Sequence, residues 1–133
     1  MGKARIDFRQ EIGIGTDIES IARFRKLDQT HHQTFLQRIY TPQELSYCFA
    51  KEYPAQHLAV RFAAKEAVLK ALGVLGVRGA APFPLNTIEI HNDKEGIPSV
   101  SLTTAHDEKF CLKVSLSHDQ DKALAFALAI RST

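Results

Sequence analysis

The segment of residues 123–130 constrains the fold most strongly, because two kinds of apolar residue alternate along it. Alanine stands at every second position from Ala123, and the positions between hold larger apolar side chains: Leu124, Phe126, Leu128 and Ile130. Successive residues of a β-strand point to opposite faces, so the pattern predicts a strand with one face of methyl groups. Such a face favours close coverage by a helix or by another subunit. A long helix predicted over residues 55–72 is the obvious partner.

Residues 55–72 show the helical period, and Gly73 is the predicted left-handed terminator of that helix. At about 100° per residue, one apolar stripe of this helix includes a lysine: Leu58, Phe62, Lys65, Leu69 and Leu72. Glu66 and Lys70, four residues apart, lie beside the stripe. Two interpretations stay open. Either these charged residues form a binding site, or Lys65 snorkels to solvent while Glu66 and Lys70 form an ordinary helix-surface pair.

Capping and alternation signals predict the other elements of the chain. Residues 11–18 read as a strand that runs into a helix over residues 18–27. Residues 41–44, TPQE, form a capping box with proline at the first helical position, which predicts a helix to about residue 51. Three further strands are predicted, the first two joined as an antiparallel hairpin: residues 88–90, 100–102 and 110–116.

The composition is typical of one soluble globular domain. The chain has 133 residues, of which 44% are hydrophobic and 24% charged, and its formal net charge is +2. Residues 11–133 are therefore predicted to form a single domain, preceded over residues 1–10 by a disordered extension or a cloning remnant. The mild charge demands no nucleic-acid partner, and no apolar run approaches the roughly 20 residues of a membrane span. Isolated Cys48 and Cys111, with no signal-peptide core, predict a cytoplasmic protein with reduced thiols.

Asp17 and Glu66 are two carboxylates on predicted regular elements. Oxygen ligands of this kind suit Mg²⁺ that is bound together with substrate phosphates, and Lys65 and Lys70 could neutralise phosphate oxygens. A capping role for Asp17 at the following helix is an equal alternative. The six histidines show no zinc-ligand spacing, and the chain lacks the two common phosphate-binding loops, GxxxxGK[ST] and GxGxxG.

Five segments, in this order, closely resemble the holo-acyl-carrier-protein synthase family: GIGTDIESIARF (13–24), TPQEL (41–45), RFAAKEAVLKALG (61–73), TIEIHNDKEGIP (87–98) and VSLSH (114–118). This family is the small trimeric type of 4′-phosphopantetheinyl transferase, and the similarity spans about residues 12–130. The resemblance implies Mg²⁺-dependent transfer of 4′-phosphopantetheine from coenzyme A to a serine of apo acyl carrier protein, with release of adenosine 3′,5′-bisphosphate, in fatty-acid biosynthesis. It also implies an α+β fold, with an antiparallel sheet packed against a long helix, and a homotrimer with active sites at subunit boundaries.

The resemblance implies a role for each residue that matches a family motif. Asp17 and Glu66 match the magnesium carboxylates, and Lys70 matches a catalytic contact to phosphate near the scissile bond. Lys65 would be another member of the basic cluster, and His118 would serve coenzyme A binding or the architecture of the site. The general base would be Glu66 or a metal-bound water, and the motif does not choose between them.

Three further residues complete the predicted substrate-binding set within these motifs: Arg61, Gly73 and Ser117. From the residues alone, a hairpin turn is a simpler interpretation of Ser117 and its neighbour His118 than a catalytic pair, because no third partner can be identified. Two segments depart from the family pattern. Residues 73–84 replace a shorter segment, and Ile97 stands where the family often has lysine.

Arg23 and Arg25, with Lys26, form a basic cluster on the predicted first helix. The resemblance implies that this cluster docks the acidic carrier protein, although most such clusters are solvated faces. A non-catalytic homologue that only binds carrier proteins is the alternative function, because it would keep these basic residues without needing Asp17 and Glu66 together.

Overall fold

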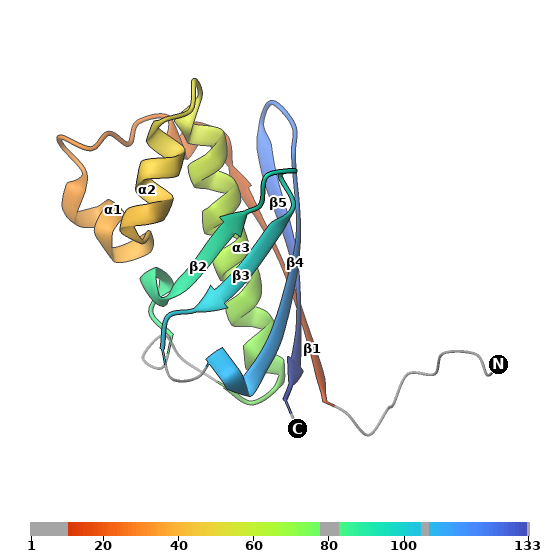
Figure 1. Cartoon of the computed structure of the whole chain (residues 1–133). Helices are drawn as coiled ribbons and strands as arrows, with labels where there is room; N and C mark the ends of the chain where they lie inside the picture. Colours follow the sequence, from red (N-terminus) through yellow and green to blue (C-terminus); the bar gives the residue numbers. More distant parts are fainter. Residues whose placement is uncertain (1–10, 78–82, 105–106, 133) are drawn as a thin grey trace.

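The computed structural model describes residues 11–77, 83–104 and 107–132, and in it one long helix lies along one face of an antiparallel sheet (Figure 1). In chain order the elements are β1 (Ile12–Ser20), η1 (Ile21–Phe24), α1 (Gln33–Ile39), α2 (Pro42–Phe49), α3 (Pro54–Val74), η2 (Leu85–Thr87), β2 (Ile88–Asn92), β3 (Pro98–Leu102), η3 (Asp107–Lys109), β4 (Phe110–His118) and β5 (Lys122–Arg131). The sheet has the order β1-β5-β4, and β2 and β3 form a separate antiparallel hairpin. The predicted α+β class, with a sheet packed on a long helix, is confirmed.

The alanine face of β5 is covered by α3, as its alternation predicts. Alanines of both elements are buried in one core cluster: Ala63, Ala67, Ala71, Ala125, Ala127 and Ala129. Two glycines of β1 permit the same close approach, because a Cβ atom at Gly13 or Gly15 would overlap a carbonyl oxygen of α3. The small residues of three elements therefore set the distance between helix and sheet.

The opposite face of the sheet carries the large apolar side chains. Ile14 and Ile18 of β1 are 57% and 60% exposed, and Leu124 and Phe126 of β5 are 46% and 40% exposed. The pairs Ile18 with Leu124 and Thr16 with Phe126 place these residues on one surface. Nothing in the described part of the chain covers this surface. Its exposed apolar residues are neighbours on one face and are not scattered singly, as they are on an ordinary protein surface.

Two predicted element boundaries are wrong. The helix expected over residues 18–27 is only the short 3₁₀ helix η1, because β1 continues to Ser20 and pairs with β5 along its whole length. Gly73 does not terminate α3. The left-handed residue is Gly76, with φ of 92°, and its N–H donates to the Gly73 carbonyl while Val77 N–H donates to the Leu72 carbonyl. These two hydrogen bonds together form a Schellman cap.

Other local predictions are confirmed. Thr41 and Glu44 form the capping box at the start of α2, with each side chain bonded to the other residue's backbone N–H. The β2–β3 hairpin turns at Asp93 and Gly96, and Gly96 has a positive φ of 84°. No helix in the described ranges is long and apolar enough to cross a membrane. The predicted extension over residues 1–10 and most of the unusual segment after α3 lie outside the described residues.

Candidate functional site

Asp17, on β1, and Lys70, on α3, meet at the edge where the strand crosses the helix. The period of the strand puts Asp17 on the inward face, beyond Gly13 and Gly15, so its carboxylate points toward α3. Lys70 Nζ donates to Asp17 Oδ1 at 3.2 Å and to the Thr16 carbonyl oxygen at 2.8 Å. The lysine side chain is 55% exposed, whereas Asp17 is largely buried. The alternative role of Asp17 as a helix N-cap is wrong, because it lies within the strand.

Glu66 lies one helical turn before Lys70 on α3. Burial raises the pKa of this carboxyl, the negative charge of Asp17 raises it further, and Lys70 partly offsets both effects. The predicted carboxylates Asp17 and Glu66 are thus brought into one electrostatic neighbourhood by a strand and a helix that are far apart in sequence.

Glu19 is a third carboxylate in this neighbourhood, and the sequence analysis did not identify it. It follows Asp17 by two residues and shares its face of β1. Burial raises the pKa of Glu19, as do the charge of Asp17 and a hydrogen bond to Asp17 that only the protonated form can donate. Arg23 Nη1 lies 3.1 Å from Glu19 Oε2 and opposes this shift. The signal was the two-residue spacing, which points to one face only if residue 19 belongs to a strand.

The carboxylates fit a divalent cation that is shared with a substrate. Asp17 Oδ2 is buried and has no hydrogen-bond partner within the described part of the chain. Among these residues, no group of three or more histidine, cysteine, aspartate or glutamate side chains could hold a metal ion by itself. The chain would therefore supply only part of a coordination shell, which is the usual arrangement for Mg²⁺ bound with phosphates.

Lys65 is fully buried, and the structure contradicts both interpretations of it. Its ammonium donates to Glu44 Oε1 at 2.6 Å and to the carbonyl oxygens of Leu85 and Ile88. An ammonium has three N–H donors, so none remains for a phosphate. Lys65 neither snorkels to solvent nor joins a substrate-facing basic cluster, because its partners on α2 and beside β2 enclose it.

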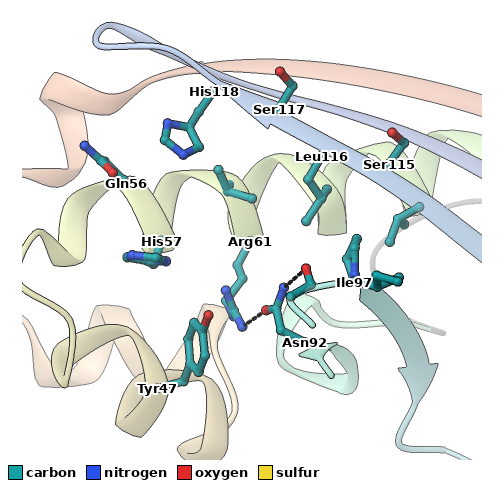
Figure 2. Close-up of a pocket in the computed structure, with 14 residues that line it drawn as sticks. Tyr47, Gln56, His57, Arg61, Asn92, Ile97, Ser115, Leu116, Ser117 and His118 are labelled. Carbon is teal, nitrogen blue, oxygen red and sulfur yellow. Dashed lines mark hydrogen bonds between the residues drawn. The ribbon is translucent and has the colours of Figure 1, made fainter. Parts of the chain in front are cut away.

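A pocket of about 510 Å³ opens between α3, β4 and the β2–β3 hairpin (Figure 2). Its polar lining is basic or neutral and includes four side chains on α3 and β4: His57, Arg61, Ser117 and His118. Asp17, Glu66 and Lys70 are not among the residues that line it. Three of the predicted substrate-binding residues, Arg61, Ser117 and His118, therefore share this pocket and lie apart from the carboxylate site in the protomer.

Arg61 is held rigidly in the wall of the pocket. Its side chain is 3% exposed, Nη2 donates to Asn92 Oδ1 at 2.6 Å, and the guanidinium lies 4.2 Å from the centre of the Tyr47 ring. Its Nε is buried and has no hydrogen-bond partner in the described part of the chain. A buried guanidinium with an unused donor is suited to an anionic ligand.

The other predicted site residues lie elsewhere. Arg23 pairs with Glu19, and Arg25 Nη2 donates to the Gln120 carbonyl oxygen at 3.3 Å, so both arginines lie on the exposed surface near η1. Gly73 lies in the last turn of α3, and a Cβ atom there would meet no neighbour. The structure gives Gly73 no contact that explains a binding role.

The family model of the 4′-phosphopantetheinyl transferase superfamily matches residues 13–129. The chain belongs to this superfamily. Its relatives include the holo-[acyl-carrier-protein] synthase of Geotalea daltonii, which is 44% identical over 85% of this chain and 93% of its own. The synthase of Protochlamydia amoebophila is 42% identical over 88% of this chain and 96% of its own. The resemblance stated from the sequence is confirmed.

Solved structures of the same enzyme family have the same fold. The Bacillus anthracis synthase, in complex with CoA (3′,5′-ADP), has a TM-score of 0.74 and 28% identity, covering 92% of this chain and 99% of that chain. The Helicobacter pylori synthase in complex with coenzyme A has a TM-score of 0.71 and 33% identity, covering 90% of this chain and 99% of that chain. These phosphopantetheinyl transferases align over nearly their whole length with the elements that form both the carboxylate site and the pocket.

Proposed function

We infer that the protein is a holo-[acyl-carrier-protein] synthase, an enzyme that transfers 4′-phosphopantetheine from coenzyme A to a serine of apo acyl carrier protein. The observation that carries this inference is the match to synthases over nearly the full length of both chains, at up to 44% identity. Structural relatives solved in complex with coenzyme A support its identity as the donor substrate. The carboxylate cluster and the basic pocket supply the chemistry that a phosphate-rich donor requires.

We propose that Asp17 and Glu66 hold Mg²⁺ together with the pyrophosphate of coenzyme A. When bound, the metal counters negative charge on the transferred and departing phosphates. Lys70 is placed to contact a phosphate oxygen directly. Among the described residues, its exposed ammonium has only Asp17 and the Thr16 carbonyl oxygen as partners. Glu66 or a water beside it accepts the proton of the carrier serine. The raised pKa of Glu66 favours such a proton acceptor.

The pocket is the proposed site for the rest of coenzyme A. Arg61 and His118 supply positive charge or hydrogen-bond donors, and Ser117 adds a hydroxyl at the end of β4. The pocket also has apolar walls, including Val60 and Leu116, that suit the uncharged parts of the ligand. Because the pocket and the carboxylate site are separate in one protomer, a single coenzyme A molecule would be shared between neighbouring subunits.

A homotrimer is the proposed assembly that brings the two sites together. The exposed apolar face of β1 and β5, with Ile14, Ile18 and Phe126, is the surface that such an assembly would bury. The enzyme is proposed to act in the cytoplasm in fatty-acid biosynthesis. Arg23 and Arg25 are proposed to attract the acidic carrier protein to the carboxylate site, where Glu19 already holds Arg23 close by.

The direct test of the proposed reaction is the mass of an apo acyl carrier protein after incubation with this protein, coenzyme A and Mg²⁺. An increase equal to one phosphopantetheine group, absent when the carrier serine is replaced by alanine, supports the enzyme. A non-catalytic homologue would bind the carrier and leave its mass unchanged, and that result would overturn the proposal.

A further inference from the structure

Glu19 lies between the proposed metal site and the proposed docking surface for the carrier protein. It shares the inward face of β1 with Asp17, and the two carboxyl groups are within hydrogen-bond reach of each other. On its other side, Glu19 Oε2 accepts a hydrogen bond from Arg23 Nη1 at 3.1 Å. One carboxylate therefore contacts both a residue assigned to the metal and a residue assigned to the carrier.

The two members of the Glu19–Arg23 pair differ in their freedom to move. The Glu19 side chain is 11% exposed, and its partner in the sheet, Ala123, is buried in a core cluster with Ala59 of α3. The Arg23 side chain is 65% exposed and belongs to the short helix η1. The glutamate is thus fixed by the sheet, whereas the arginine can leave it without disturbing the core.

Arg23 and a metal ion would compensate the same negative charge. Asp17, Glu19 and Glu66 repel one another, and Arg23 partly offsets this repulsion at Glu19. A divalent cation at Asp17 and Glu66 would offset it as well, so Glu19 would then need its arginine less. An acidic group of the carrier would compete with Glu19 for Arg23, and the three carboxylates would then need the cation more.

We propose that the Glu19–Arg23 pair couples the metal site to carrier docking, so that the metal and the carrier strengthen each other's binding. The metal takes over the charge of Glu19 and frees Arg23 for the carrier; the carrier takes Arg23 and leaves the charge of Glu19 to the metal. This inference rests on the proposed function, which places Mg²⁺ at Asp17 and Glu66. Glu19 acts through its charge as a positioning residue, since the described residues provide no group of three metal ligands.

The affinity for an apo carrier protein whose serine is replaced by alanine measures this coupling, because coupling between two binding sites is reciprocal. Fluorescence anisotropy of the labelled carrier gives the dissociation constant without coenzyme A, in chelator and in Mg²⁺, at equal ionic strength. Mg²⁺ should tighten binding to the wild type about 3- to 5-fold more than it tightens binding to Glu19→Gln, since an exposed ion pair is worth up to about this factor. Effects of Mg²⁺ on the carrier itself are common to both proteins and cancel.

Two comparisons show whether the coupling passes through Arg23. In a protein that already carries Arg23→Gln, the further change Glu19→Gln should no longer alter the Mg²⁺ response. Glu11→Gln breaks an exposed pair with Arg131 at the other end of β1, and this control should respond to Mg²⁺ as the wild type does. An equal Mg²⁺ response in the wild type and Glu19→Gln, or the same loss of response in Glu11→Gln, would overturn the inference.

Binding of Mn²⁺ alone, followed by the loss of its paramagnetic resonance signal, decides the question if Glu19→Gln is unfolded by circular dichroism. Arg23→Gln should bind Mn²⁺ about 3- to 5-fold more tightly than the wild type, because it leaves Glu19 without its cation. Equal or weaker binding would overturn the inference. If the wild type modifies the carrier but lacks the coupling, the proposed function survives; a wild type that neither binds nor modifies the carrier would overturn both.

Discussion

Three carboxylates repel one another in the metal-free protein, where the end of β1 lies against the middle of α3. Asp17, Glu19 and Glu66 interact electrostatically, and the pKa values of Glu19 and Glu66 are both raised. Only Lys70 and Arg23 lie within ion-pair distance of this group in the described structure. Like charges held together by a fold are a common mark of a functional site, because they are stabilised when a cation binds.

Replacement of Glu66 by glutamine should stabilise the metal-free protein at neutral pH. A glutamate whose folded pKa is raised above its ordinary value of 4.5 contributes stability below that value, and the contribution is lost as the pH rises through the raised pKa. Glu66→Gln removes that loss. With chelator at pH 8, its Tm should exceed that of the wild type by roughly 2 °C, a small change because solvent screens this half-buried group. A lower Tm for the variant at pH 8, or the same difference at pH 4, would contradict this account of the site.

The sequence allowed the pairing of Asp17 with Glu66 to be predicted, but not the surroundings of either residue. The resemblance identified both carboxylates, and the structure places them together. Lys65 was misread because a helical projection shows only which face a side chain occupies. Whether a lysine on an apolar face reaches solvent or a buried carboxylate depends on Glu44, which belongs to another helix.

At the scale of elements, the buried ion pair between Glu44 and Lys65 joins α2, α3 and the start of β2. Glu44 accepts hydrogen bonds from Thr41 N–H, Lys65 Nζ and Ile90 N–H. Every polar atom of the pair thus has a partner, and the pair fixes how the hairpin that carries Asn92 lies against α3. The positions of the α3 wall and of the hairpin wall of the pocket relative to each other depend on this arrangement.

Lys65→Met should destabilise the protein strongly, because it leaves the Glu44 carboxylate buried without its cation. Removal of one partner of a buried pair costs about 3–5 kcal/mol, whereas replacement of both partners is often close to neutral. Urea unfolding at one fixed protein concentration measures the difference. The double variant Glu44→Gln, Lys65→Met should recover much of the lost stability. If the free energy of unfolding of Lys65→Met lies within about 1 kcal/mol of the wild-type value, the ion pair does not hold α2, α3 and β2 together.

The short helix η1 is the element proposed to meet the carrier protein. Because Arg23 contacts Glu19, a glutamate at position 23 would add repulsion inside the carboxylate site. Glutamine removes the positive charge without adding that repulsion. Arg23→Gln, Arg25→Gln should raise the KM for apo carrier about 3- to 10-fold, leave the KM for coenzyme A nearly unchanged, and weaken the salt dependence of transfer. Lys109→Gln, at the other end of the sheet, is the matched control. Unchanged carrier KM and salt dependence in the double variant would show that the docking surface lies elsewhere.

Elements with a strong periodic signal were predicted well, and those set by long-range pairing were not. The alternation of β5 and the capping box of α2 are local patterns, and both elements formed as expected. The end of β1 was misplaced because Ile18 and Ile21 fit a helix locally, while the pairing of β1 with β5 as far as Ser20 decides the structure. The end of α3 was misplaced because two glycines, Gly73 and Gly76, could each have capped it.

For the molecule as a whole, the exposed apolar face of the sheet and the separation of the two sites point to the same assembly. Phe126→Lys should convert the proposed trimer to a monomer and reduce transfer at least 10-fold, because a charge in the centre of an apolar interface is strongly unfavourable. Light scattering after size-exclusion chromatography gives the mass. Val74→Lys, at an exposed apolar residue at the end of α3, is the control and should leave the assembly unchanged. A monomeric wild type at micromolar concentration would contradict the assembly.

Asp17 of β1 and Glu66 of α3 are proposed to serve metal-dependent transfer of phosphopantetheine together. The decisive measurement is the initial rate at which Asp17→Asn modifies apo acyl carrier protein, followed by mass across a Mg²⁺ titration. The asparagine keeps the shape of the side chain and removes its charge. We expect a rate at least about 100-fold below that of the wild type at every Mg²⁺ concentration, with an unchanged circular dichroism spectrum. Near-normal transfer by the folded variant, or full wild-type activity in chelator, would contradict it.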